Sequence, residues 1–482
     1  MPRSYAKTAL EDVSMHGQEI NSMVRRNRRI AIVCQPWDNV TSQSENSIVT
    51  VSYQIARFLV PDYYVTIYGR RGSGQKRWEV DGRIEYKRFK VFQKPQQFIE
   101  TFFSVLACYR KRRIKYMLSM WYHLFYAVRV AVSIRASKCN VIHVHNFLQF
   151  AYLIKLLNPE ATICLHMHCE WLRQFATERR LRKMDLIVGV SDYITARTRI
   201  RFPAIAGRCH TVYNGVDSNR FCPSPEAPSQ RDATPHLLFL ARVSPEKGVH
   251  VLIRAFKILA ETHPTLHLDI VGHAGILPYI YLLPEPDDKV TSSLEEFYGN
   301  RLSEMFQRQL ILKGQSYSDD LASAAAGDGR IVFHGAIPHA ETIDLYRRAT
   351  VMVLPSVWNE PSPLPAYEAA ACGLAVVATR SGGIPEIVEH GQTGMLVARG
   401  DAKELAMAIS QVIDDPALAR AMGEAGRQRV LERFTWEASA RHLADLIESV
   451  PRGKPGERTK ALNSSASKRR LARNPLRNSE EK

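Results

Sequence analysis

The sequence predicts an α/β protein made of two doubly wound parallel-sheet domains that face each other across a cleft. Short apolar runs recur along the chain with helical patterns between many of them, which is typical of parallel sheets. A Pro- and Ser-rich stretch at 221–235 divides these runs into two groups and predicts a linker. With 482 residues, 45% of them hydrophobic, the chain can bury the cores of two or three domains.

The first domain is predicted to span residues 29–220, after a polar N-terminal arm at 1–28. The loop at 38–45 contains no glycine. The apolar runs predict a helix at 48–59 and strands at 29–37, 64–68, 84–91, 141–145, 162–168, 186–190 and 211–216.

The second domain is predicted to span residues 236–434. We expect an insertion of unassigned role at 275–314, a last helix at 435–450, and a basic, Ser-rich, disordered tail at 451–482. The remaining patterns predict a helix that ends at Ala260, helices at 341–348 and 363–372, and strands at 236–243, 266–272, 331–335, 351–354 and 374–379.

The overall charge indicates an anionic partner. The net charge is +17, which suits nucleic acid, a membrane face or an anionic substrate. No nucleic-acid recognition motif accompanies the basic residues, so we expect no nucleic acid. The eight cysteines are scattered, as in a reduced, cytoplasmic protein. The sequence contains neither a signal-peptide pattern nor an apolar run of spanning length, so we expect neither secretion nor a membrane span.

The stretch at 351–397 places two carboxylates, Glu360 and Glu368, near one ligand-sized space. Glu360 lies in the loop after a predicted buried strand, and Glu368 lies about one turn into the next helix. Carboxylates accept hydrogen bonds from sugar hydroxyls, while the helix start and the turn at 381–383 offer N–H groups to a phosphate. The alternative is an ordinary strand–helix–strand unit with two solvated glutamates.

The spacing within this stretch resembles a known signature. Seven residues separate Glu360 from Glu368, and Ala-Ala-Ala-Cys-Gly and Gly-Gly-Ile-Pro-Glu follow. This pattern resembles the donor site of retaining glycosyltransferases with the GT-B fold, of the family 4-like, group 1 type. Three segments of the first domain, VIHVHN, VGVSDYI and VYNGVDSNRF, are similar to the same family. The resemblance runs from about Arg29 to Val450 and implies two Rossmann-like domains.

The resemblance implies donor-site roles for seven residues. Glu368 would hold the nucleotide ribose, and Glu360 would contact the transferred sugar together with Ser362 and Pro363. Many members have glycine in place of Pro363, which has no N–H, so a phosphate contact would fall to Leu364. Two cations would bind the donor diphosphate, the forked guanidinium of Arg242 and the ammonium of Lys247. For this pair, an ion-paired surface turn is the alternative.

Metal-ligand residue types gather around the strand predicted at 162–168. Cys164, His166 and His168 would share one face of it, and Cys169 would point away. A zinc site needs convergent ligands, and we identify no second Cys/His cluster, so we expect no metal. The resembling family has a cleft histidine near the sugar at the end of this strand. This implies a catalytic role for His168, with His166 as the second choice and a satisfied structural histidine as the alternative.

Residues 98–137 interleave aromatic side chains with a basic run, 110–113. One interpretation is two core-facing helices joined by a solvated basic turn. The other is a surface that meets anionic lipid, which would place a cytoplasmic protein at the inner face of the membrane.

Together, these observations predict a hexosyltransferase. It would move sugar from a nucleotide diphosphate sugar, with UDP-sugar favoured, to a glycan or lipid-linked acceptor in cell-envelope polysaccharide or glycolipid synthesis. Retention of configuration is implied by the resemblance alone, and we expect no cofactor. Two alternatives are a sugar-nucleotide epimerase of GT-B type and a non-catalytic coat or scaffold protein with the same fold.

Overall fold

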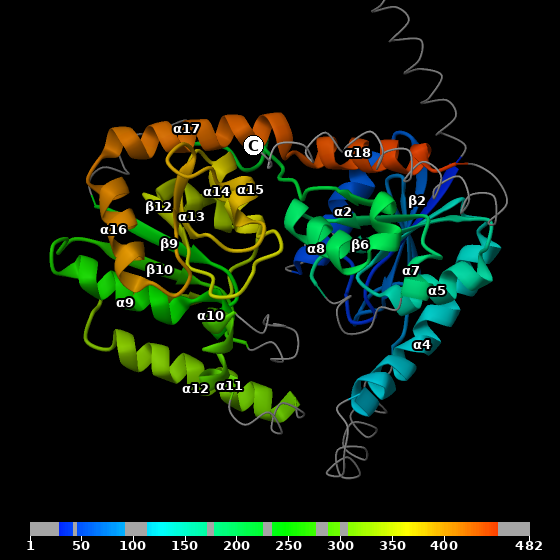
Figure 1. Ribbon diagram of the computed structural model, residues 1–482, viewed down its shortest axis with the longest axis horizontal. Coiled ribbons are helices and arrows are strands. Elements are labelled where there is room, and N and C mark those ends of the chain that lie inside the picture. The colour runs from blue at the N-terminus through cyan, green and yellow to red at the C-terminus, as the bar shows by residue number, and fades with distance from the viewer. Residues whose placement is uncertain are drawn as a thin grey trace, which may run out of the picture.

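The computed structural model describes residues 28–41, 46–91, 113–170, 178–224, 234–275, 288–298 and 307–451, without the side chains of 113–122, 298 and 307–315. Nearly all of the predicted N-terminal arm and C-terminal tail, most of the predicted linker and half of the predicted insertion lie outside these ranges. Two α/β domains stand side by side, and the last two helices, α17 (Pro416–Arg433) and α18 (Trp436–Ser449), run across both of them (Figure 1).

The first domain is built on an eight-stranded sheet with the order β3-β4-β2-β1-β5-β6-β7-β8. Neighbouring strands are parallel except at one edge, where β3 runs antiparallel to β4. The strands are β1 (Arg28–Val33), β2 (Tyr63–Arg70), β3 (Trp78–Asp81), β4 (Ile84–Phe89), β5 (Val141–His145), β6 (Thr162–Met167), β7 (Leu186–Gly189) and β8 (Cys209–Thr211). The helices are α2 (Ser47–Leu59), α4 (Arg113–Ala136), α5 (Leu148–Leu157), α7 (Glu178–Leu181), α8 (Asp192–Arg201) and the 3-10 helix η1 (Pro203–Arg208).

The second domain is built on a six-stranded parallel sheet with the order β11-β10-β9-β12-β13-β14. The strands are β9 (His236–Leu240), β10 (His267–Val271), β11 (Ile331–Gly335), β12 (Val351–Leu354), β13 (Ala375–Thr379) and β14 (Gly394–Val397). The helices are η2 (Pro245–Lys247, 3-10), α9 (Val249–Ala260), α10 (Lys289–Ser292), α11 (Glu295–Tyr298), α12 (Gln307–Ala325), α13 (Thr342–Arg348), α14 (Leu364–Ala371), α15 (Ile384–Ile387) and α16 (Ala402–Ile413), followed by α17.

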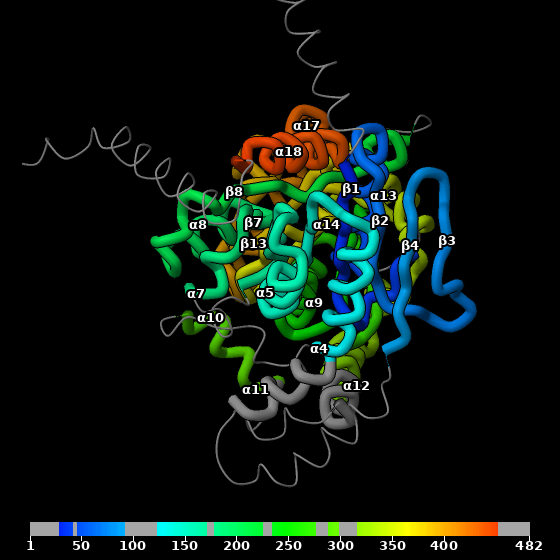
Figure 2. The backbone as a smooth tube through the Cα atoms, turned by 90° about the vertical axis from the view of Figure 1, so that its right-hand side faces the viewer, coloured from blue at the N-terminus to red at the C-terminus, as the bar shows by residue number. Residues whose placement is uncertain are grey.

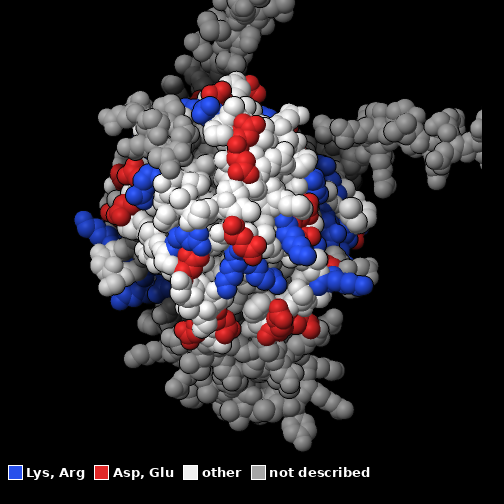
Figure 3. Space-filling view, turned by 90° about the vertical axis from the view of Figure 1, so that its left-hand side faces the viewer, with Lys and Arg blue, Asp and Glu red and all other residues white. Residues whose placement is uncertain are grey.

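Helices cover both faces of each sheet, because side chains that alternate along a buried strand need apolar partners on either side. In the first domain, one core lies under α4 and α5 and the other under α2 and α18. In the second domain, one core lies under α9, α12 and α16 and the other under α13, α14 and α17. Figure 3 views the outer end of the second domain, where acidic and basic side chains are interspersed.

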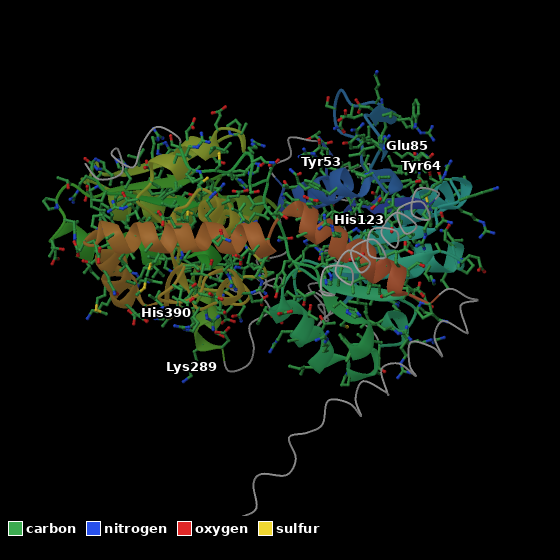
Figure 4. The ribbon with its side chains drawn as sticks, turned by 90° about the horizontal axis from the view of Figure 1, so that it is seen from above. Tyr53, Tyr64, Glu85, His123, Lys289 and His390 are labelled. Atoms are coloured by element: carbon green, nitrogen blue, oxygen red, sulfur yellow. The ribbon has the colours of Figure 1, made fainter. Side chains whose placement is uncertain are left out.

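The chain returns to the first domain through α18. Its buried side chains Trp436, Leu443 and Ile447 belong to the same core as the buried face of α2. Just before this helix, Phe434 accepts a backbone hydrogen bond from Val216 of the first domain at 2.9 Å. Seen from above, α17 and α18 extend from the domain that carries Lys289 and His390 to the one that carries Tyr53 and His123 (Figure 4).

The predicted fold class is confirmed, but some elements differ from the prediction. The strand predicted at 211–216 was wrong, because β8 ends at Thr211 and the backbone beyond it turns to the second domain. Residues 113–136 form one helix, α4, and residues 98–112 lie outside the described residues, so the two-helix interpretation of 98–137 stays a prediction. The antiparallel edge strand β3 was not predicted. Among the described helices, none has both the length and the apolar composition needed to cross a membrane.

Candidate active site

An ion pair between the partly buried Lys247 and the buried Glu360 lies at the carboxyl edge of the second sheet. Glu360 is only 4% exposed and follows β12, while Lys247 is the last residue of η2. The hydroxyl of Ser356 donates to the Glu360 carboxylate at 3.3 Å. The ammonium of Lys247 also lies 5.4 Å from the centre of the Trp358 ring. Two residues predicted to bind the donor are therefore in contact.

Glycines allow the loops that carry this ion pair to approach each other. Gly248 has a φ of +76°, and a Cβ on it would lie 1.9 Å from the carbonyl oxygen of Pro355. Gly382 has a φ of +53°, and a Cβ there would lie 2.0 Å from the carbonyl oxygen of Glu360. The same carbonyl accepts the N–H of Gly383 at 2.7 Å. A side chain at either Gly248 or Gly382 would force the loops apart.

Arg242 is held beside this pair by a carboxylate that the sequence analysis did not single out. Its guanidinium donates to Glu246 at 2.6 Å and to the hydroxyl of Ser244 at 3.3 Å. Burial alone would raise the pKa of the Glu246 carboxyl, but the charges of Arg242 and Lys247 hold it below its ordinary value. Glu246 therefore stays ionised and fixes the guanidinium in place.

Glu368 is a buried residue of α14 with two partners of its own. One carboxylate oxygen contacts Nε2 of His339 at 2.7 Å, and the other accepts the hydroxyl of Tyr346 at 2.8 Å. Burial alone would lower the pKa of His339, but the hydrogen bond and charge of Glu368 raise it above its ordinary value. No hydrogen bond or ion pair among the described residues joins Glu368 to Glu360. Neither the spacing nor the type of His339 and Tyr346 pointed to this role.

The predicted sugar-side residues form the loop into α14. Asn214 of the first domain donates to the Ser362 hydroxyl at 3.1 Å, and that hydroxyl also lies 2.9 Å from the Tyr367 hydroxyl. Pro363 occupies the N-cap position of α14, Leu364 is its first residue, and no side chain caps this helix start. Pro365 has no N–H, and the N–H of Ala366 donates to the Pro363 carbonyl at 3.1 Å. Leu364 therefore carries the first-turn N–H that no side chain caps.

His168 belongs to a cluster of four histidines on two neighbouring strands. Because β5 and β6 are parallel and in register, His143 and His145 lie beside His166 and His168. Nε2 of His143 lies 3.0 Å from Nδ1 of His166, and Nδ1 of His145 lies 2.7 Å from Nε2 of His168. The prediction that no second Cys/His cluster accompanies His166 and His168 was therefore wrong, because VIHVHN was interpreted only as a family segment.

This cluster is a hydrogen-bonded ladder of neutral rings. Burial lowers the pKa of His143 to about 3 and the pKa values of His145 and His166 far below their ordinary range. One nitrogen from each of these three rings lies within 4.8 Å of the others. The His143 and His145 rings stack on the His166 ring with centroids 5.0 and 5.3 Å away, and they are tilted relative to each other with centroids 4.5 Å apart. Because His143 and His166 hydrogen-bond each other, and His145 bonds Ser52 and His168, we assign no metal to the ladder.

Asp38 is a buried carboxyl whose sequence neighbourhood gave no signal of a functional role. It lies in the loop after β1, and burial raises its pKa to about 6 despite hydrogen bonds from Gln35. The side chain of Gln35 in turn accepts from Asn146 at 3.4 Å, and Asn146 accepts the backbone N–H of His168 at 2.8 Å. Hydrogen bonds therefore join the first loop to His168. Among the described residues, none joins His168 to Glu360 or Lys247.

Two family models match almost the whole of both domains. The Glycosyltransferase Family 4 model matches residues 48–220, and the Glycosyl transferases group 1 model matches residues 224–429. The chain belongs to the group 1 glycosyltransferases of GT-B fold. The family predicted from the spacing of Glu360 and Glu368 is therefore confirmed.

This glycosyltransferase has curated relatives and solved structural neighbours. Spore coat protein SA of Bacillus subtilis is 24% identical over 340 residues, covering 67% of this chain and 82% of the relative. The GDP-mannose-dependent alpha-(1-6)-phosphatidylinositol monomannoside mannosyltransferase of Mycolicibacterium smegmatis is 29% identical over 282 residues, covering 55% of this chain and 64% of the relative. The structure of Anabaena HepE in complex with UDP-glucose has a TM-score of 0.59 at 18% identity and covers 87% of this chain and 99% of its own.

In this glycosyltransferase, Glu386 connects the donor-side turn to the first domain. It lies in α15, directly after Gly382 and Gly383, and its carboxylate accepts the N–H groups of Asp192 and Tyr193 at 2.7 Å each. Those N–H groups belong to the first turn of α8. Burial raises the pKa of the Glu386 carboxyl to about 7, although both N–H bonds act to lower it. The contact therefore titrates near neutral pH.

We predict that Glu386 makes the free energy of unfolding depend on pH. Because its folded-state pKa is raised, this group stabilises the fold most below its unfolded pKa, and the contribution is lost as pH rises to about 7. The melting temperature of wild type should therefore fall relative to Glu386→Gln between about pH 4.5 and about pH 7. Exposed Glu424→Gln is the matched control, and its curve should stay parallel to wild type. Parallel curves for Glu386→Gln as well would contradict the assignment.

Proposed function

We propose that this glycosyltransferase moves a hexose-type sugar from a nucleoside diphosphate sugar to a hydroxyl of a glycan or lipid-linked acceptor, with retention of configuration. The observation that carries the proposal is the Lys247–Glu360 pair with Arg242 close by, at the strand edge where open α/β sheets bind ligands. The UDP-glucose complex of HepE favours a UDP-sugar donor. The phosphatidylinositol acceptor named for the mycobacterial relative favours a role in cell-envelope glycolipid or polysaccharide synthesis.

In the proposed reaction, the bond between the anomeric carbon and the diphosphate oxygen breaks, and the acceptor oxygen forms a new bond to that carbon. The diphosphate leaves with the bonding electron pair, and the proton of the acceptor hydroxyl passes to the departing diphosphate oxygen. Arg242 and Lys247 would stabilise the charge that the diphosphate gains. The N–H of Leu364, at the start of α14 without a capping side chain, would donate to the same group.

The two glutamates and His168 would orient the rest of the donor. Glu368 is already bound by His339 and Tyr346 but has lone pairs left for ribose hydroxyls. Glu360 would accept from sugar hydroxyls beside Ser362 and Pro363. Because Glu360 pairs with Lys247, the incoming diphosphate has to share that ammonium with the carboxylate. His168 would contact the sugar from the first domain as a neutral imidazole, since burial lowers its pKa far below the ordinary range.

We predict different kinetic losses for the two glutamates. Glu368→Gln should mainly weaken nucleotide binding, and Glu360→Gln should mainly lower turnover and sugar selectivity. Each lost hydrogen bond to a charged group is worth about 1.5–3 kcal/mol, or roughly 10- to 150-fold. Initial rates against nucleotide-sugar concentration, with calorimetry of nucleotide binding, measure both effects. Exposed Glu424→Gln is the control. Wild-type kinetics in both variants would remove the donor-site assignment.

We further propose that the reaction uses no divalent metal. Two aspartate pairs of the sequence are candidate metal ligands. Asp319 and Asp320 are exposed on α12. Asp288 accepts a hydrogen bond from Asn359 of the donor-side loop at 3.4 Å, but its carboxylate is paired with Arg399 at 2.9 Å. Asp287 lies outside the described residues. Fixed cations and helix N–H groups would then neutralise the leaving diphosphate in place of a metal.

Activity should therefore survive a chelator, while Arg242→Ala or Lys247→Ala should each lower the rate about 10²- to 10³-fold, by analogy with loss of one transition-state donor. Release of nucleoside diphosphate is the measurement. Activity that is abolished by chelation and restored by magnesium or manganese would show the proposal to be wrong. No turnover of any nucleotide sugar would instead favour a non-catalytic coat or scaffold protein; one relative is named Spore coat protein SA.

A further inference from the structure

A pocket of about 550 Å³ lies on the first domain, away from the donor-side loops, between α4 and the edge strands β3 and β4. Figure 2 shows these three elements on one side of the molecule. Basic side chains line the pocket, and no carboxylate is among its lining residues; the four cations are Arg77, Lys87, Arg88 and Arg129. Phe89, Val128 and Val132 form much of its apolar wall.

Two of the four cations remain available for an anion. Arg88 is paired with Glu79 at 2.5 Å, and Lys87 lies 3.3 Å from Glu85. For Arg77 and Arg129, no ion pair occurs among the residues that the structure describes. The Arg129 guanidinium instead lies 4.8 Å from the centre of the Phe89 ring, which fixes it at the pocket wall. The pocket is therefore positively charged overall.

Large apolar side chains surround this charge and are open to solvent. Phe125 is 66% exposed, Trp78 60%, Val132 56% and Val80 51%. The indole N–H of Trp78 donates to Glu85 at 2.7 Å, so its polar edge is bonded while the ring stays exposed. Protein surfaces that lie at a membrane interface typically combine basic side chains with exposed aromatic and aliphatic ones.

We propose that this pocket binds the phosphate headgroup of an anionic phospholipid and docks the first domain on a membrane surface. Arg77 and Arg129 would contact the phosphate, while Trp78, Phe125 and Val132 would enter the acyl boundary. A nucleic acid would satisfy the cations but leave these apolar side chains in water, whereas a lipid covers both. The sequence predicted a membrane contact at 98–137. The proposal places this contact on the C-terminal part of α4 and on β3 and β4, while residues 98–112 lie outside the described residues.

The test is co-sedimentation of the full chain with vesicles of phosphatidylcholine alone or mixed with phosphatidylglycerol. The double variant Arg77→Gln/Arg129→Gln should bind the anionic vesicles about 25-fold more weakly than wild type, at about fivefold for each basic residue. Phe125→Ser should weaken binding at low and at high salt, because salt does not screen the apolar contact of the Phe125 ring with lipid.

The matched control is Lys257→Gln/Lys403→Gln, which removes the same charge from exposed positions of the second domain. The basic residues of 452–482 are common to all variants, so any general charge attraction affects them equally. Melting temperatures check that each variant is folded. An equal loss in the control pair, or equal binding to neutral and anionic vesicles, would overturn the proposal. So would a concentration-dependent dimer in light scattering that the Arg77→Gln/Arg129→Gln variant abolishes, since the pocket would then face a second copy of the chain.

Discussion

The ion pair between Lys247 and Glu360 is the interaction on which the second-domain site depends. Removing two charges from water is expensive, and their attraction compensates only when further hydrogen bonds satisfy them. Here Ser356 supplies one such bond, and the nearby Arg242 and Glu246 form a second pair of charges. The arrangement requires close contact between the loops around Lys247, Glu360 and Gly382. Glycine is therefore needed at positions 248 and 382, where these loops touch.

The loops that hold this pair also determine how the two domains meet. The turn that packs on the Glu360 backbone continues directly into α15, where Glu386 accepts two N–H groups from α8 of the first domain. Asn214 bonds Ser362 across the same boundary, and α18 shares a core with α2. Donor-side geometry and domain arrangement are therefore coupled through a small number of polar contacts and one shared core. The titration of Glu386 near neutral pH makes one of these contacts sensitive to pH.

The sequence was sufficient to predict those parts of the fold and site in which a local residue pattern determines the local structure. Apolar runs located most strands, and the spacing of Glu360 and Glu368 identified the family. It was insufficient where strand pairing or distant loops decide the contact. His143 and His145 join His166 and His168 only because β5 and β6 pair in register. Likewise, His339 reaches Glu368 from another loop, with no signal in its own neighbourhood. Beyond Thr211, contacts with the second domain overrode the apolar pattern that predicted a strand.

A double-mutant cycle on the ligand-free enzyme tests the central ion pair most directly. Urea unfolding of wild type, Lys247→Met, Glu360→Gln and the double variant gives the coupling free energy between the two side chains. Each single change leaves one charge buried without its partner and should cost about 3–5 kcal/mol. The double variant should cost less than the sum of the single losses, with a coupling of at least about 1 kcal/mol. Losses that add within about 0.3–0.5 kcal/mol would contradict the account, because the two charges would then be stabilised independently of each other.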